Sequence, residues 1–213
     1  MNKGILVFDI DGVILESLQA KTKAFEELYF NYGKKITKNI ISHHKKNGGI
    51  SRFEKIKFYN KEFLKIDDKK TDEKFIKNFS SITKEIIINC DFVNGFLTFL
   101  SKIENNYDLY ISTGTPTNEA KLILQKKKII KKFKIIYGSP ESKISHLKNI
   151  LSFYSKINYD SLFFFGDSII DYEAAIKFKF NFLLRFHNEN KFLINNKNIF
   201  YKFKDFNDPS LLD

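Results

Sequence analysis

Short apolar runs alternate with longer segments of helical pattern along most of the chain. The first run, Gly4–Phe8, stops at an Asp-Ile-Asp-Gly sequence, and a short apolar run that ends at a turn glycine is typical of a buried strand. Four later runs look alike and cover residues 109–112, 133–137, 162–165 and 182–184. The segments between them, such as 116–127 and 142–153, have lengths that suit helices. This alternation predicts an α/β fold with a Rossmann-like parallel sheet and helices on both of its faces.

The interval between the first two predicted strands, roughly residues 14 to 106, is far longer than one crossover helix requires. Its pattern is helical over residues 18–32, 51–64 and 72–88, and a helix near 95–104 then returns to the sheet. We therefore predict a core domain formed by residues 1–13 and 91–213, and a helical cap domain formed by residues 14–90. The tail after Phe186 is polar and weakly patterned, so we predict nothing for it beyond packing.

The composition is that of a soluble globular protein, because 43% of the 213 residues are hydrophobic and 29% are charged. No apolar run approaches the roughly 18 residues that a membrane helix needs. Asp9 interrupts the N-terminal apolar run, which is too short for a secretory signal. With Cys90 as the only cysteine, no intrachain disulfide can form. We expect a cytoplasmic protein with no membrane partner.

The formal net charge is +11, which raises the question of an anionic partner. The lysines are scattered along the chain, for example at Lys34, Lys45 and Lys131, and are not gathered into one stripe. This distribution favours solvated surface lysines, so we do not expect nucleic acid as the partner.

Four carboxylates come just after predicted strands: Asp9 and Asp11 after the first, Asp167 and Asp171 after the fourth. The carboxyl ends of parallel strands share one edge of the sheet, where ligands bind in open α/β folds. Carboxylates crowded there repel each other unless a cation lies between them, and oxygen ligands suit Mg²⁺. Asp9 and Asp11 start from the same face of the strand, so one can attack while its neighbour transfers a proton.

Four segments resemble, in chain order, the motifs of the haloacid dehalogenase (HAD) superfamily. Residues 7–13 resemble motif I, and residues 164–168 followed by Asp171 resemble motif IV. Residues 110–116 resemble motif II, and residues 138–143 resemble a motif III variant with its lysine. DxDG alone is a weak signal, but the ordered set is specific. It implies a HAD fold with a type C1 helical cap.

The resemblance implies a role for each acidic residue. Asp9 would attack the phosphorus atom in line and form an aspartyl-phosphate. Asp11 would protonate the leaving oxygen and then activate the hydrolytic water. Mg²⁺ would be held by Asp9, by the backbone carbonyl of Asp11 and by Asp167, with Asp171 as a further or water-mediated ligand.

The resemblance also implies residues that bind the phosphoryl group. Thr113 and the backbone N–H of Gly114 would bind phosphate oxygens, and Lys143 would offset negative charge. Such donors suit a transition state in which charge is spread over the phosphoryl oxygens. Two alternatives stay open: Ser112 could take the place of Thr113, and Lys148 could take the place of Lys143.

Residues 47–55 form the most informative part of the predicted cap. Two glycines are followed by Ser51 and, three residues later, by Glu54, which is typical of a capped helix start. The segment also resembles the specificity loop of type C1 caps in relatives of β-phosphoglucomutase and phosphoglycolate phosphatase. That resemblance implies that Arg52 and Lys55 contact the substrate.

The sequence thus favours an enzyme: a Mg²⁺-dependent HAD-like phosphatase that acts through an aspartyl-phosphate. Its substrate would be a small phosphorylated metabolite, either a sugar phosphate or a phosphoglycolate-like acid. A phosphomutase of the β-phosphoglucomutase type is the alternative, because Asp11 permits both reactions. A non-catalytic nucleic-acid-binding scaffold is an alternative of another class; it predicts steeply salt-dependent binding but does not explain why every catalytic position is filled.

Overall fold

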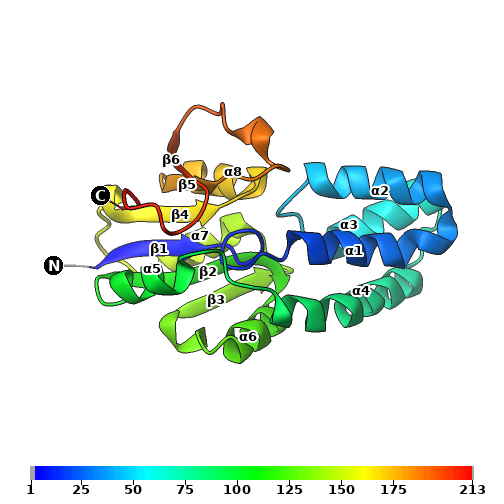
Figure 1. The fold of residues 1–213 in the computed structure, drawn as a ribbon, viewed down its shortest axis with the longest axis horizontal. Coiled ribbons are helices and arrows are strands. Elements are labelled where there is room, and N and C mark those ends of the chain that lie inside the picture. The colour runs from blue at the N-terminus through cyan, green and yellow to red at the C-terminus, as the bar shows by residue number, and fades with distance from the viewer. Residues whose placement is uncertain (1–2, 213) are drawn as a thin grey trace.

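A computed structural model describes residues 3–212, and its core is a six-stranded sheet in which every neighbouring pair of strands is parallel (Figure 1). The strand order is β3-β2-β1-β4-β5-β6. The strands are β1 (Gly4–Phe8), β2 (Tyr107–Pro116), β3 (Ile135–Ser139), β4 (Leu162–Gly166), β5 (Asn181–Arg185) and β6 (Ile199–Phe203). The predicted α/β fold with a parallel sheet is confirmed.

Alternation along the strands divides the core into two layers. Leu6 and Phe8 of β1 pack into one apolar cluster, and Ile5 and Val7 pack into the other. Side chains of a strand point alternately to its two faces, so a strand covered on both faces has apolar residues at every position. The first cluster is covered by α5 (Phe96–Ile103) and α6 (Thr117–Lys126), and the second by α7 (Lys143–Leu151) and α8 (Ile169–Lys177).

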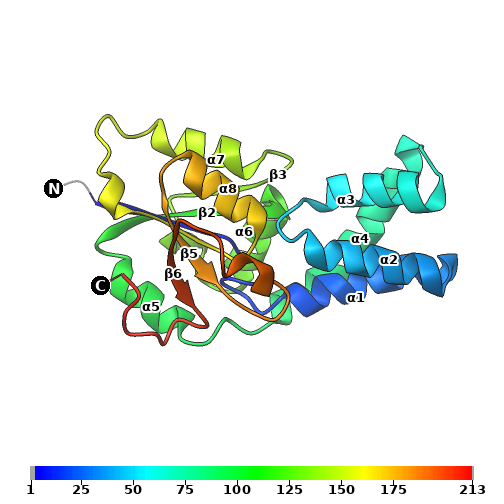
Figure 2. The same ribbon diagram turned by 90° about the horizontal axis from the view of Figure 1, so that it is seen from above.

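Four helices form a second lobe beyond the carboxyl ends of the strands (Figures 1 and 2). They are α1 (Leu18–Tyr29), α2 (Lys34–Lys46), α3 (Arg52–Tyr59) and α4 (Lys69–Asn89), and all fall inside the range predicted for the cap. This lobe has its own aromatic core around Phe25, Tyr59 and Phe79. We call it the cap. Short helical turns complete the chain at η1 (Phe30–Tyr32), η2 (Asn60–Leu64), η3 (Ile130–Lys132), η4 (Tyr159–Ser161) and η5 (Lys191–Leu193).

Two elements escaped the sequence analysis. Helix α2 is rich in lysine, and it buries only Thr37, Ile40 and His44, so its apolar stripe is narrow. Strand β6 lies in the tail for which we predicted only packing, and that prediction was wrong. It is an edge strand whose exposed and buried positions alternate, with Phe203 as its one fully buried residue.

Among residues 3–212, none of the helices has both the length and the apolar character that a membrane span needs.

Candidate active site

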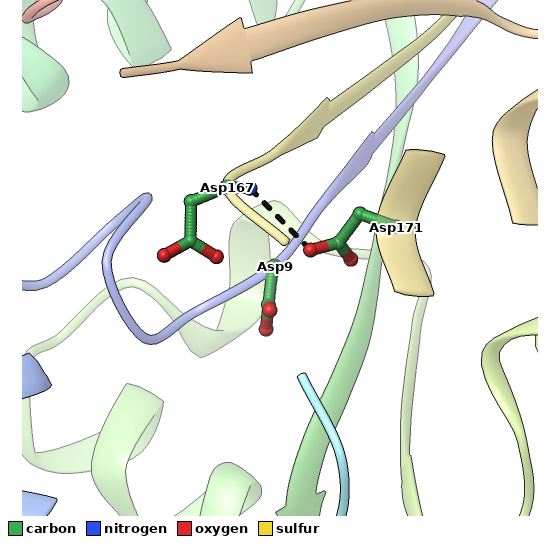
Figure 3. A group of neighbouring side chains, drawn as sticks. All are labelled: Asp9, Asp167 and Asp171. Atoms are coloured by element: carbon green, nitrogen blue, oxygen red, sulfur yellow. Dashed lines mark hydrogen bonds between the residues drawn. The ribbon is translucent and has the colours of Figure 1, made fainter. Parts of the chain in front are cut away.

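Three of the four predicted acidic residues converge at the carboxyl edge of the sheet (Figure 3). Asp9 directly follows β1, Asp167 directly follows β4, and Asp171 lies in the first turn of α8. Strands β1 and β4 pair in register, Phe8 opposite Phe165, so their ends meet. One carboxylate oxygen from each acid lies within 4.8 Å of the others, and all three residues are buried.

Asp171 fixes the start of α8 and contacts the site at the same time. Its Oδ2 accepts hydrogen bonds from the Ser168 hydroxyl at 2.6 Å and from the Ser168 backbone N–H at 3.1 Å, which completes a capping box. Its Oδ1 accepts a hydrogen bond from the Lys143 ammonium. The role of helix-capping acid and the role in the site are therefore compatible in one residue.

Lys143 links two of the acids from the first position of α7. Its side chain is 3% exposed, and Nζ donates to Oδ2 of Asp9 at 2.6 Å as well as to Asp171. Burial raises the pKa of Asp9 to about 6, against the opposing effect of the Lys143 charge. Burial alone would lower the pKa of Lys143, but the carboxylates of Asp171 and Asp9 outweigh it and raise that pKa. The alternative, Lys148, is exposed to solvent on α7.

Asp11 has different partners from the other acids. Its Oδ1 accepts from the Ser17 hydroxyl at 2.6 Å, and its Oδ2 accepts from Lys21 Nζ at 2.5 Å and from the Thr115 hydroxyl at 2.8 Å. Burial alone would raise the pKa of Asp11, but the Lys21 ammonium and these hydroxyl donors lower it. Asp11 is therefore held as a carboxylate by a lysine of cap helix α1.

Sequence reasoning missed the partners of Asp11. Ser17 and Lys21 are four residues apart at the start of α1, a spacing that places both on one face of a helix. That spacing was visible in the sequence, but nothing in it indicated that this face meets Asp11. Thr115 lies just beyond the predicted phosphate-binding residues of the same strand.

Neighbouring residues at the end of β2 point to opposite sides. Thr113 and Gly114 line a cleft together with Lys143. The hydroxyl of Ser112 instead contacts Nδ1 of His146 at 2.9 Å inside the core. Thr113, rather than Ser112, thus faces the group of charged side chains.

The cap loop lies directly on the edge of the sheet. Gly49 has φ +80°, and a Cβ atom there would lie 2.3 Å from the hydroxyl oxygen of Ser168. A Cβ atom on Gly114 would in turn lie 2.8 Å from the carbonyl oxygen of Gly49. Both glycines are therefore needed for this close approach.

A cavity of about 60 Å³ lies between the sheet edge and the cap. Asp9, Asp11 and Asp167 line its core side, and Lys21, Arg52 and Lys55 are the cationic residues on its cap side. The structure thus brings both predicted cap residues to the same cavity as the acids.

Arg52 and Lys55 differ in their partners. The Arg52 guanidinium donates to both carboxylate oxygens of Glu119 at 2.8 Å and to the Ser80 hydroxyl at 2.7 Å. Lys55 Nζ lies 3.0 Å from Nδ1 of His44. Arg52 therefore links the cap to helix α6 of the core, whereas the hydrogen-bond partner of Lys55, His44, belongs to cap helix α2.

The loop after β5 supports Asp167 through two residues that the sequence did not single out for a role. His187 Nε2 lies 3.0 Å from Oδ2 of Asp167, and the side-chain amide of Asn190 donates to the Asp167 backbone carbonyl at 2.7 Å. No motif in the polar tail signalled these contacts.

The comparison with protein families defines the class. The sequence matches the model of haloacid dehalogenase-like hydrolases over residues 6–184, and the chain belongs to this family. The resemblance identified from the four motifs is confirmed. No curated protein matches the sequence.

Solved structures share the fold over nearly the whole chain. A predicted phosphoglycolate phosphatase from Haemophilus somnus superimposes with a TM-score of 0.75 at 18% identity, covering 96% of this chain and 95% of that one. The β-phosphoglucomutase of Clostridium difficile gives 0.73 at 17% identity, covering 97% and 92%. YfnB of Bacillus subtilis, described as a HAD hydrolase and solved with bound magnesium, gives 0.70 at 14% identity, covering 97% and 96%. At these identities the likeness shows a shared fold.

Proposed function

We propose that this hydrolase is a Mg²⁺-dependent phosphatase that removes the phosphoryl group of a small metabolite through an aspartyl-phosphate on Asp9. One observation carries the proposal. The carboxylate of Asp9 lines a small cavity under the cap, with Asp167, Asp171 and Lys143 gathered around it. Membership of the hydrolase family and the phosphatases among the structural neighbours support it.

The charges and donor atoms of the site fit a divalent cation. Lys143 forms ion pairs with two of the three buried carboxylates, Asp9 and Asp171, and burial raises the pKa of Asp9, Asp167 and Asp171. Added positive charge would stabilise their ionised forms, and an all-oxygen donor set suits Mg²⁺. Asp9, Asp167 and the Asp11 backbone carbonyl would hold the ion, with Asp171 as a further or water-mediated ligand. The ion would neutralise charge on the phosphoryl oxygens. Bound magnesium in YfnB is consistent with this assignment.

The hydrogen bonds of Asp9 orient it for attack. Its Oδ1 accepts from the backbone N–H of Ile10 at 2.6 Å, and its Oδ2 accepts from Lys143. A fixed carboxylate can approach phosphorus in line without first losing side-chain freedom. Thr113, the Gly114 N–H and Lys143 would then surround the phosphoryl oxygens with donors.

Asp11 is suited to the proton transfers that hydrolysis needs. Its lowered pKa keeps it ionised, which is the form that removes a proton from the attacking water in the second step. To protonate the leaving oxygen in the first step, Asp11 would first have to take up a proton, which the lowered pKa disfavours, so its environment suits the second step better. The hydroxyls of Ser17 and Thr115 fix the carboxylate in place for both roles.

Removing divalent metal is expected to abolish most of the activity. In an assay of p-nitrophenyl phosphate hydrolysis, chelation with EDTA should lower kcat by about 100-fold or more, because a metal ion supplies several kcal/mol of transition-state stabilisation. Excess Mg²⁺ should restore the rate. Full activity in EDTA would show that no metal ion takes part.

Assays with a sugar phosphate and with RNA separate the alternatives. A phosphomutase would convert a sugar phosphate to its isomer and release little inorganic phosphate. A nucleic-acid scaffold would release no phosphate from any ester and would bind RNA with a steep dependence on salt.

A further inference from the structure

Lys55 is a buried cation without an anionic partner. Its side chain lines the cavity, the residue is 4% exposed, and Nζ has only Nδ1 of His44 at 3.0 Å and the His44 carbonyl at 3.4 Å as partners. Within residues 3–212, no carboxylate forms an ion pair with it. Three other cationic residues at the site are paired with carboxylates: Lys21 with Asp11, Arg52 with Glu119, and Lys143 with Asp9 and Asp171.

The surroundings of Lys55 make its charged form less favourable than that of a lysine in water. Burial, followed by the charge of Lys21 on α1, lowers the pKa of Lys55 to about 7, although Asp167 and Glu54 act in the opposite direction. Burial and then Lys55 itself hold the pKa of His44 well below its usual range, so this ring is neutral and leaves Lys55 uncompensated. An anion that enters the cavity would supply the missing charge.

The cap side of the cavity is poorly suited to sugar hydroxyls. Leu18, Phe25, Ile50 and Phe79 make its apolar walls. Ser51 and Glu54 of the cap line the neighbouring cleft instead, where they hydrogen-bond to each other at 2.9 Å. Hydroxyl groups that lose water without finding acceptors bind poorly.

We propose that Lys55 is the specificity-determining residue of the site and binds a carboxylate on a short phosphate monoester. Arg52, which the sequence analysis also expected to contact the substrate, is held by Glu119 and Ser80 and joins the cap to the core. The inference rests on the proposed function, because it assumes that the phosphoryl group binds at Asp9. In this arrangement the phosphoryl group lies at Asp9 and the carboxylate at the other end of the substrate contacts the cap.

A pair of probes of equal length tests this assignment. In the full-length Asp9→Asn protein with Mg²⁺, calorimetry would compare 2-phosphoglycolate with 2-hydroxyethyl phosphate, which carries a hydroxyl in place of the carboxylate. We expect phosphoglycolate to bind about 10- to 100-fold more tightly, as a hydrogen bond between charged groups allows. Equal affinities would overturn the proposal before any change at Lys55 is made.

Two lysines of helix α3 then provide the variant and its control. Lys55→Met in the same background should bring the affinity ratio of the two probes close to one. Lys57→Met, at an exposed position of the same helix, should leave the ratio as it was. If Lys55→Met does not fold, Lys55→Gln replaces it. A ratio that survives loss of the Lys55 charge would overturn the assignment.

These experiments distinguish failure of the assignment of Lys55 from failure of the phosphatase proposal. If the native chain hydrolyses neither compound but the Lys55-dependent preference is present, the specificity assignment stands and the phosphatase proposal falls. If the native chain hydrolyses both compounds with equal kcat/KM, the phosphatase proposal stands and the role of Lys55 is overturned.

Discussion

Replacing Asp9 with asparagine is expected to lower kcat for aryl phosphate hydrolysis by about 10⁴-fold or more, the scale on which loss of a nucleophile acts in enzymes that form covalent intermediates. The asparagine amide has nearly the same shape but cannot form an acyl phosphate. Steady-state kinetics in Mg²⁺ measures the effect. Residual turnover within about 10-fold of the native rate would show that the attacking group is another residue.

A matched substitution separates this effect from general damage. Asp91 is an exposed aspartate in the segment that leads from the cap back to the sheet, so Asp91→Asn should leave kcat unchanged. Asp9→Asn should also remain folded, because Lys143 keeps Asp171 as an ionic partner. Near-native thermal unfolding of both variants would confirm that only chemistry was lost at Asp9.

Replacing Lys143 with methionine is expected to lower both stability and turnover. It leaves the carboxylates of Asp9 and Asp171 buried without their shared cation, and removing one partner of a buried ion pair costs about 3–5 kcal/mol. Urea denaturation measures this loss. In the folded fraction, kcat should fall by about 10²–10³-fold, because a charged donor to the phosphoryl oxygens is missing.

Lys148→Met on the same helix is the control for Lys143. Its exposed side chain predicts a change in unfolding free energy within about 0.5 kcal/mol and an unchanged kcat. Loss of activity in Lys148→Met, with Lys143→Met active and stable, would reverse the assignment of the motif lysine.

Residues whose position depends on a strand end were predictable from the sequence. Asp9 and Asp167 each follow an apolar run, and parallel strands bring such positions to a common edge. Thr113 and Lys143 came instead from the resemblance to the family motifs, which left Ser112 and Lys148 open as alternatives. The folded chain decides between these alternatives, because Thr113 lines the cleft while Ser112 contacts His146 in the core. Lys143 is buried at the site.

Contacts between the cap and the core could not be predicted in this way. The hydrogen bond of Lys21 to Asp11 and the ion pair of Arg52 with Glu119 depend on how two lobes sit against each other. No periodicity within one element carries that information. The different environments of Arg52 and Lys55, three residues apart on one helix, illustrate the same point.

Strand β6 and the loop before it could not be predicted, because their own sequence has little apolar pattern. Strand β6 pairs on one side only and buries little, so its apolar pattern is weak. The loop that precedes it nevertheless brings His187 and Asn190 to Asp167. The path of the backbone in this loop directs their hydrogen-bonding groups at the site. The hydrophobic pattern of the sequence does not predict that path.

Trapping the phosphorylated protein tests most directly whether Asp9 is the nucleophile. The Asp11→Asn variant would be mixed with p-nitrophenyl phosphate and Mg²⁺, quenched in acid and mapped by peptide mass spectrometry. A good leaving group needs no proton from Asp11, whereas hydrolysis needs Asp11 as a base, so we expect a phosphoryl group to accumulate on Asp9. A phosphoryl group on a different residue, or rapid release of phosphate from an unmodified chain, would contradict attack by Asp9.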